Sequence, residues 1–238
     1  MDINVLMNRE KPYKINSVNV RPANTGAGRI AGLFICALAL LGCLLISDVY
    51  PESQSAQYKE YEVKAAFMYN FLKFIDWPED KAKNSSEIII GIIGQDPFGG
   101  AADILKDKKV EERSVVLKRI DSFDKVKNSA DANEQMDTLK KCYLLFICQS
   151  ERKNTKDIID LLKNNSVLTV SDTHGFLEDG GIINFVIEDN KVRFNINLTA
   201  SENAGLKIRS QLLRLAKKVI KDGAEVTGLS ETARKEAK

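Results

Sequence analysis

Histidine is nearly absent from this chain, which has a single one, His174, among 238 residues. No group of His, Cys, Asp and Glu residues has the spacing of metal ligands, so we expect no metal site. Ser171 and Asp172 lie close to His174, but neighbouring loop positions usually point in different directions, and no glycine-flanked nucleophile elbow precedes them. The chain is therefore expected to be non-catalytic, and no catalytic residue or cofactor is assigned.

Positive and negative charges nearly balance, since 35 Lys and Arg residues and 33 Asp and Glu residues give a formal net charge of only +2. Part of that charge comes from basic residues ahead of the apolar segment 30–46, such as Arg9, Arg21 and Arg29. The remainder of the chain is close to neutral, and nucleic-acid binding would require a basic surface. No nucleic-acid partner is expected.

The one long hydrophobic run, IAGLFICALALLGCLLI at 30–46, lies between the two usual lengths for an apolar N-terminal segment. A membrane span needs about 20 apolar residues and a signal peptide about 7–15. Cleavage after Ser55, an uncleaved anchor and a lipobox ending at Cys43 all remain open, although apolar residues continue past Cys43. Each places residues 58–238 outside the cytoplasm. We expect residues 1–57 to be the leader or anchor with its linker, 58–221 the folded domain, and 222–238 a polar flexible tail.

Cysteine is too sparse for a disulfide framework. Cys36 and Cys43 lie in the apolar segment, which leaves Cys142 and Cys148 for the folded part. On an extended strand these two would be about 20 Å apart, too far for a bridge. We predict no disulfide and two buried free thiols.

The folded part alternates short apolar runs with helical patterns, which is typical of an α/β fold. A helix is expected over 61–74, with Pro78 after its end. Further helices are expected with Asp96 as N-cap and Pro97 as the first helical position, around 136–140 and over 152–162. The expected strands are 88–94, 114–120, 143–148 and 166–170.

The last part of the domain predicts a hairpin and a helix. Two apolar runs, 182–187 and 192–198, flank a polar turn that contains Asp189 and Asn190, as in an antiparallel hairpin. The last helix is expected to begin at Ser201 or Glu202, because leucines and other apolar residues from Leu206 to Ile220 are spaced as on one side of a long helix. The fold class expected is α/β, with a mostly parallel mixed sheet flanked by helices, a C-terminal β-hairpin and a long final helix.

Loops that follow parallel strands converge at the carboxyl edge of the sheet, where partners tend to bind. We expect loops 94–100, 148–152 and 171–180 to meet there, and Phe98, His174 and Phe176 to contact a partner. An aromatic residue beside glycine is as often a lid packed over the core. The glycines of 94–100 lack the Lys-Ser or Lys-Thr of a phosphate loop and fit a structural turn capped by Asp96.

Four blocks of this sequence resemble the YfiR-like family of bacterial exported proteins. The resemblance extends from about Tyr58 to Ile220 and rests on the blocks occurring in the same order. They are YEVKAAFMYNFLKFIDWP (61–78), IIGQDPFGG (92–100), SVLTVSDTHGFLEDGGIINFVIEDNKVRFNINL (166–198) and AGLKIRSQLLRLAKKV (204–219).

The resemblance implies a periplasmic, dimeric regulator that represses an inner-membrane diguanylate cyclase by holding its periplasmic domain. It also implies sequestration by an outer-membrane lipoprotein of the OmpA-like kind. Some members carry a disulfide cysteine in the segment matching 175–184, where this chain has none. Two other functions remain open: a periplasmic small-molecule sensor, and an accessory subunit of an outer-membrane transport system.

Overall fold

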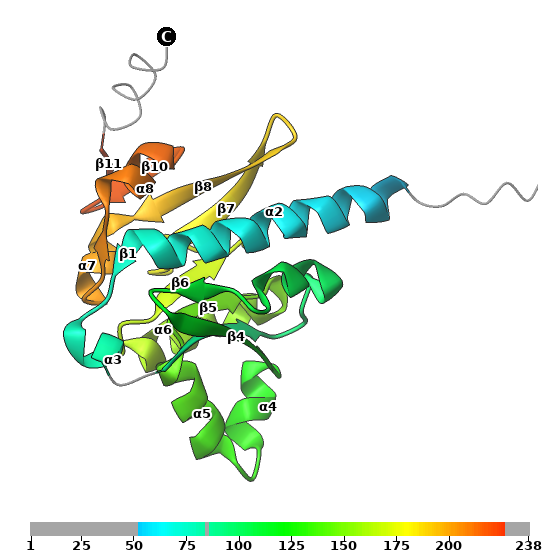
Figure 1. Ribbon diagram of the computed structural model, residues 1–238, viewed down its shortest axis with the longest axis vertical. Helices are drawn as coiled ribbons and strands as arrows, with labels where there is room; N and C mark the ends of the chain where they lie inside the picture. Colours follow the sequence, from blue (N-terminus) through cyan, green and yellow to red (C-terminus); the bar gives the residue numbers. More distant parts are fainter. Residues whose placement is uncertain (1–51, 84–85, 227–238) are drawn as a thin grey trace, which may run out of the picture. The chain divides into compact units, whose positions relative to one another are not determined.

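The computed structural model describes residues 52–83 and 86–226, which form an α/β domain around a mixed sheet (Figure 1). The nine-stranded sheet has the order β11-β10-β8-β7-β6-β5-β2-β4-β3. Its strands are β2 (Glu87–Ile93), β3 (Lys109–Val110), β4 (Arg113–Ile120), β5 (Leu144–Ile147), β6 (Leu168–Ser171), β7 (Ile183–Glu188), β8 (Lys191–Asn197), β10 (Lys218–Lys221) and β11 (Ala224–Glu225).

The centre of the sheet is parallel, because β4, β2, β5, β6 and β7 pair side by side in the same direction. Strand β5 is buried on both faces, as its continuous apolar run predicts. Leu144 and Phe146 belong to the core on the α2 side, whereas Leu145 and Ile147 belong to the core on the other side. The strands expected near 88–94, 114–120, 143–148 and 166–170 are thereby confirmed.

Antiparallel pairs occur at both ends of the sheet, so the sheet is mixed rather than mostly parallel. Strand β3 pairs antiparallel with β4, and β10 with β11. The predicted hairpin is confirmed as β7 and β8, in register from Ile183↔Ile196 to Glu188↔Lys191. Asp189 and Asn190 both have positive φ, which a tight hairpin turn requires and which these residue types tolerate.

One long helix packs on the first face of the sheet. Helix α2 (Glu52–Phe74) includes the helix expected over 61–74 and begins earlier. Phe71 is fully buried there, with its ring 5.8 Å from that of Phe185 and 5.1 Å from that of Phe194. After Phe74 the chain forms β1 (Ile75–Asp76), which pairs with β9 (Lys207–Ile208) in a separate two-stranded sheet.

The second face is covered by shorter helices, seen opposite α2 in Figure 1. Leu139 of α5, and Ile158 and Leu162 of α6, bury their side chains against β5 there. Helices of the domain besides α2 are α3 (Glu79–Lys83), η1 (Gly99–Leu105), α4 (Phe123–Asn128), α5 (Ala132–Lys141), η2 (Gln149–Asn154), α6 (Thr155–Leu162), α7 (Leu198–Asn203) and α8 (Ser210–Leu215).

The long final helix was wrongly predicted. The chain makes α7, β9, α8 and β10 in its place. Gly205, at φ +70°, ends the first helical stretch, and Leu206 donates from its backbone N–H to the carbonyl of Ser201. After Gly205 the chain forms strands β9 and β10 instead of a continuous helix, because Ile208 pairs with Ile75 and Val219 pairs with Ile196.

Some expectations concern segments outside the described residues. The apolar segment 30–46 is one of them, as is the end of the polar tail, 227–238. Asp222, where we expect the tail to begin, lies in the turn between β10 and β11. Among helices of the described ranges, none has the length and hydrophobicity of a membrane span.

Candidate functional site at the carboxyl edge of the sheet

The loops after β2, β5 and β6 meet, as predicted. The backbone N–H of Gln95 donates to Ser150 Oγ over 2.9 Å, which ties the first loop to the second. Ser171 Oγ donates to the carbonyl oxygen of Ile147 over 2.7 Å, which ties the third loop to the end of β5. The carboxyl edge of the parallel strands is therefore one continuous surface.

A buried ion pair joins this edge to helix α2. Lys64 Nζ lies 2.6 Å from Asp172 Oδ2 and 2.6 Å from Glu60 Oε1, and its side chain is only 3 % exposed. The hydroxyl of Tyr61 donates to the same Asp172 oxygen over 2.8 Å. Burial of the phenol, and then the negative charge of Asp172, raise the pKa of Tyr61, so it remains a neutral donor.

Sequence reasoning missed Lys64. A lysine within an amphipathic helix usually lies on the solvated face, yet Lys64 lies between the buried residues Tyr61 and Met68 on the side facing the sheet. That position on the apolar side of α2 was the available signal, because a charge there needs a partner.

The three predicted contact residues have different environments. Phe98 is 2 % exposed and packs with ring-centroid distances of 5.0 Å to Tyr61 and 4.8 Å to Phe146. Phe176 is 1 % exposed and belongs to the core on the other face, where its ring lies against Gly181. Only His174 is exposed. The two phenylalanines are therefore lids over the core, the alternative considered above, and the structure does not bring the three together.

Loop 94–100 is a structural turn. Asp96 Oδ1 accepts the backbone N–H of Phe98 over 2.7 Å, and Asp96 Oδ2 accepts from Arg119 Nε over 2.6 Å. Arg119 also donates to the carbonyl oxygen of Gly99. The Asp96 carboxylate thus fixes the conformation of its own loop, as expected for a structural turn. Asp96 is not the helix N-cap that was predicted, because η1 begins at Gly99 with Phe98 as its N-cap.

Cys142 and Cys148 are both buried and free. Burial raises the pKa of the Cys142 thiol to about 12. Burial, followed by the charges of Asp96, Asp172 and Glu151, raises the pKa of Cys148 as well. The thiolate is the reactive form, so both side chains are inert in the folded protein.

We therefore expect neither of these two thiols to react with iodoacetamide at pH 8 until the protein is unfolded. Peptide mass spectrometry after labelling distinguishes them from Cys36 and Cys43. Labelling of Cys148 in the native protein as fast as in denaturant would show that the carboxyl edge is open to reagents.

A cleft of about 580 Å³ opens beside this edge, where β6 ends and β7 continues. Strand β7 pairs with β6 only through Val170↔Ile183 and Ser171↔Asn184, so residues 185–188 extend past the end of β6. The cleft is lined from α2, the 172–178 loop and strands β7, β8 and β10. Its size suits a small ligand or a side chain of a partner.

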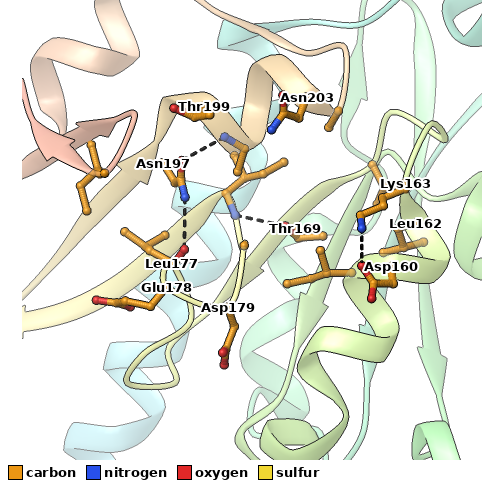
Figure 2. A pocket seen from close by; sticks show the side chains of 18 residues that line it. Asp160, Leu162, Lys163, Thr169, Leu177, Glu178, Asp179, Asn197, Thr199 and Asn203 are labelled. Carbon is orange, nitrogen blue, oxygen red and sulfur yellow. Dashed lines mark hydrogen bonds and ion pairs between the residues drawn. The ribbon is translucent and has the colours of Figure 1, made fainter.

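A second cleft, of about 590 Å³, lies on the other side of the same loop (Figure 2). Several of its polar side chains are used in local structure, among them Asn197 and Thr169. Asn197 Nδ2 donates to the carbonyl oxygen of Leu177, while its Oδ1 accepts the backbone N–H of Ala200 at the start of α7. Thr169 Oγ1 accepts the backbone N–H of Ile182. The lining of this cleft combines apolar residues such as Leu162 and Ile182 with charged residues such as Asp160 and Lys163.

Within residues 52–83 and 86–226, no group of three or more His, Cys, Asp and Glu side chains is arranged to hold a metal ion. The Asp172 carboxylate is already paired with Lys64 and Tyr61, and His174 lies at the surface.

Comparison with known proteins gives one family. The model of the YfiR/HmsC-like family matches residues 61–217. A crystal structure of a conserved domain protein from Vibrio cholerae O1 biovar El Tor is similar with a TM-score of 0.46 and 12 % identity. The similarity covers 67 % of this chain and 60 % of that chain. No curated protein matches this chain.

Proposed function

Because the chain belongs to the YfiR/HmsC-like family, we propose that it is an exported, non-catalytic protein that represses a membrane diguanylate cyclase by binding the enzyme's extracytoplasmic domain. The family match over most of the described domain is the observation that carries this proposal. Members of the family are known as periplasmic regulators of diguanylate cyclases. We also propose that it acts as a homodimer and that an OmpA-like outer-membrane lipoprotein sequesters it.

The proposed docking surface is the exposed rim of the carboxyl-edge cleft. His174 and Glu178 contribute its polar part from the loop after β6. Ile187, near the end of β7, is 52 % exposed and contributes apolar area to the same rim. A partly exposed aliphatic residue beside polar groups is a common composition of a transient interface. Phe98 and Phe176 are not part of this surface, because both are buried.

Replacement Ile187→Asp should weaken binding of the cyclase's extracytoplasmic domain by about 30-fold, or about 2 kcal/mol, because it puts a charge in the apolar part of the interface. The fold should be unaffected, since the side chain is half exposed. Leu215→Asp is the matched control, because Leu215 is 64 % exposed on α8, away from the cleft. Affinity is measured by pull-down from membranes and by titration. Equal weakening by both variants, or by neither, would contradict this surface.

Export is part of the proposal, on the basis of the basic and then apolar N-terminal sequence. An alkaline phosphatase fused after Ile220 should be active, because that enzyme requires an extracytoplasmic location. A fusion that lacks residues 30–46 should be inactive. Activity of a cytoplasmic reporter alone at the same position would contradict export.

A further inference from the structure

Two asparagine side chains on the face of the sheet away from α2 have buried carbonyl oxygens with no hydrogen-bond partner among the described residues. They are Asn184 on β7 and Asn195 on β8. An unpaired buried acceptor costs stability, so such groups are rare and need an explanation. Both residues line the 580 Å³ cleft.

The register of the sheet places the two asparagines side by side. Asn184 pairs directly with Asn195, Ser171 of β6 pairs with Asn184, and Lys218 of β10 pairs with Asn195. Directly opposed residues have Cβ atoms about 4.5–5.5 Å apart. The four side chains therefore form a polar row across β6, β7, β8 and β10.

This row faces away from α2. The next residues along β7 and β8, Phe185 and Phe194, pack on Phe71 of that helix. Because successive side chains on a strand point to opposite faces, Asn184 and Asn195 point to the other side. Asn184 is 8 % exposed and therefore more than nine-tenths buried. Both Oδ1 atoms are buried beneath the lining of the cleft, so a ligand in the cleft reaches them only if the carboxamides make a half-turn that exchanges oxygen with nitrogen.

The other polar groups of the cleft favour a donor-bearing cation. Lys64 is already paired with Glu60 and Asp172, and Lys218 with Glu225. Glu178 is exposed at the rim and forms no ion pair with any residue of the described ranges. The cleft thus has two carboxamides with unpaired oxygens in its floor and one carboxylate at its rim.

We propose that the Asn184–Asn195 pair and Glu178 form a binding site for a small organic cation that carries paired N–H donors, with a guanidinium compound as the best match. A guanidinium group presents several N–H donors in a planar fork, which suits two neighbouring oxygens. A small molecule is favoured over a protein surface, because the acceptors are recessed. Failure of this site can be distinguished from failure of the proposed repression, because ligand binding is tested on the purified protein alone.

The test compares the binding of butylguanidinium with that of its neutral isostere, butylurea. Binding is measured by titration calorimetry and by changes in the NMR signals of the asparagine side-chain amides. Butylguanidinium should bind with a dissociation constant at least tenfold lower than that of butylurea. It should also shift the amide signals of Asn184 and Asn195. Equal binding of the two compounds, or binding of neither, would overturn the proposal.

The variants Asn184→Leu and Asn195→Leu should each weaken butylguanidinium binding at least tenfold. Both should keep or raise the melting temperature, because each removes an unpaired buried oxygen. Glu178→Gln should weaken binding less and reduce its dependence on salt. Asn203→Leu is the control, because Asn203 is exposed on α7 and does not line this cleft. This variant should bind butylguanidinium as tightly as the wild-type protein does. If the leucine variants lower the melting temperature and leave affinity unchanged, the two asparagines are structural and the proposal fails.

Discussion

Phe71→Ala should lower the free energy of unfolding by about 3–5 kcal/mol. The side chain is fully buried between α2 and the β7–β8 hairpin, in a group of rings with Phe67, Phe185 and Phe194. Truncation removes its apolar contacts and leaves a cavity that neighbouring rings cannot fill without leaving their rotamers. Denaturant unfolding of the purified protein measures the change.

Val63→Ala on the same helix is the matched control. Val63 is 44 % exposed, so its truncation should cost less than about 1 kcal/mol. A loss below about 1 kcal/mol for Phe71→Ala itself would show that α2 is not held against the hairpin as described.

Asp172→Ala should destabilise the domain by about 3 kcal/mol, because within the described ranges it leaves the buried ammonium group of Lys64 with Glu60 as its one carboxylate partner. It also removes the acceptor of the Tyr61 hydroxyl. Glu60 is partly exposed and remains in place, so the loss should be at the lower end of the range for broken buried pairs.

The double variant Lys64→Met/Asp172→Leu distinguishes the stabilisation that the ion pair contributes from the destabilisation caused by a buried charge without its partner. Removing both charges should restore most of the lost stability, since no buried ion remains without a partner. Unfolding of the two single variants and the double variant at pH 7 gives the coupling energy. A coupling near zero would mean that water, rather than Asp172, satisfies Lys64.

Strands β2 and β5 in the parallel centre of the sheet were predictable because both are continuous apolar runs, which are typical of strands covered on both faces. Residues 88–93 are an example, since almost every side chain there is buried. The final helix was not predictable in the same way. The apolar spacing from Leu206 to Val219 fits a helix, and only the pairing of Ile208 with Ile75 and of Val219 with Ile196 selects strands.

The meeting of the loops was predicted, but the side chains that line their surface were not. The meeting of the three loops follows from strand direction alone. Whether Phe98 and Phe176 point into the core or into solvent depends on loop conformation, which no local pattern encodes. The asparagines of β7 and β8 alternate visibly with apolar residues. Their pairing, and the cleft above them, depend on register and on the absence of a helix over that part of the described sheet.

The most direct test of repression is the level of cyclic-di-GMP in a strain from which the gene for this chain has been deleted. Deletion should raise cyclic-di-GMP several-fold. Expression of the wild-type protein or of Leu215→Asp should restore the original level, whereas Ile187→Asp should not. An unchanged cyclic-di-GMP level after deletion, in cells that make a membrane diguanylate cyclase with an extracytoplasmic domain, would contradict the proposed function.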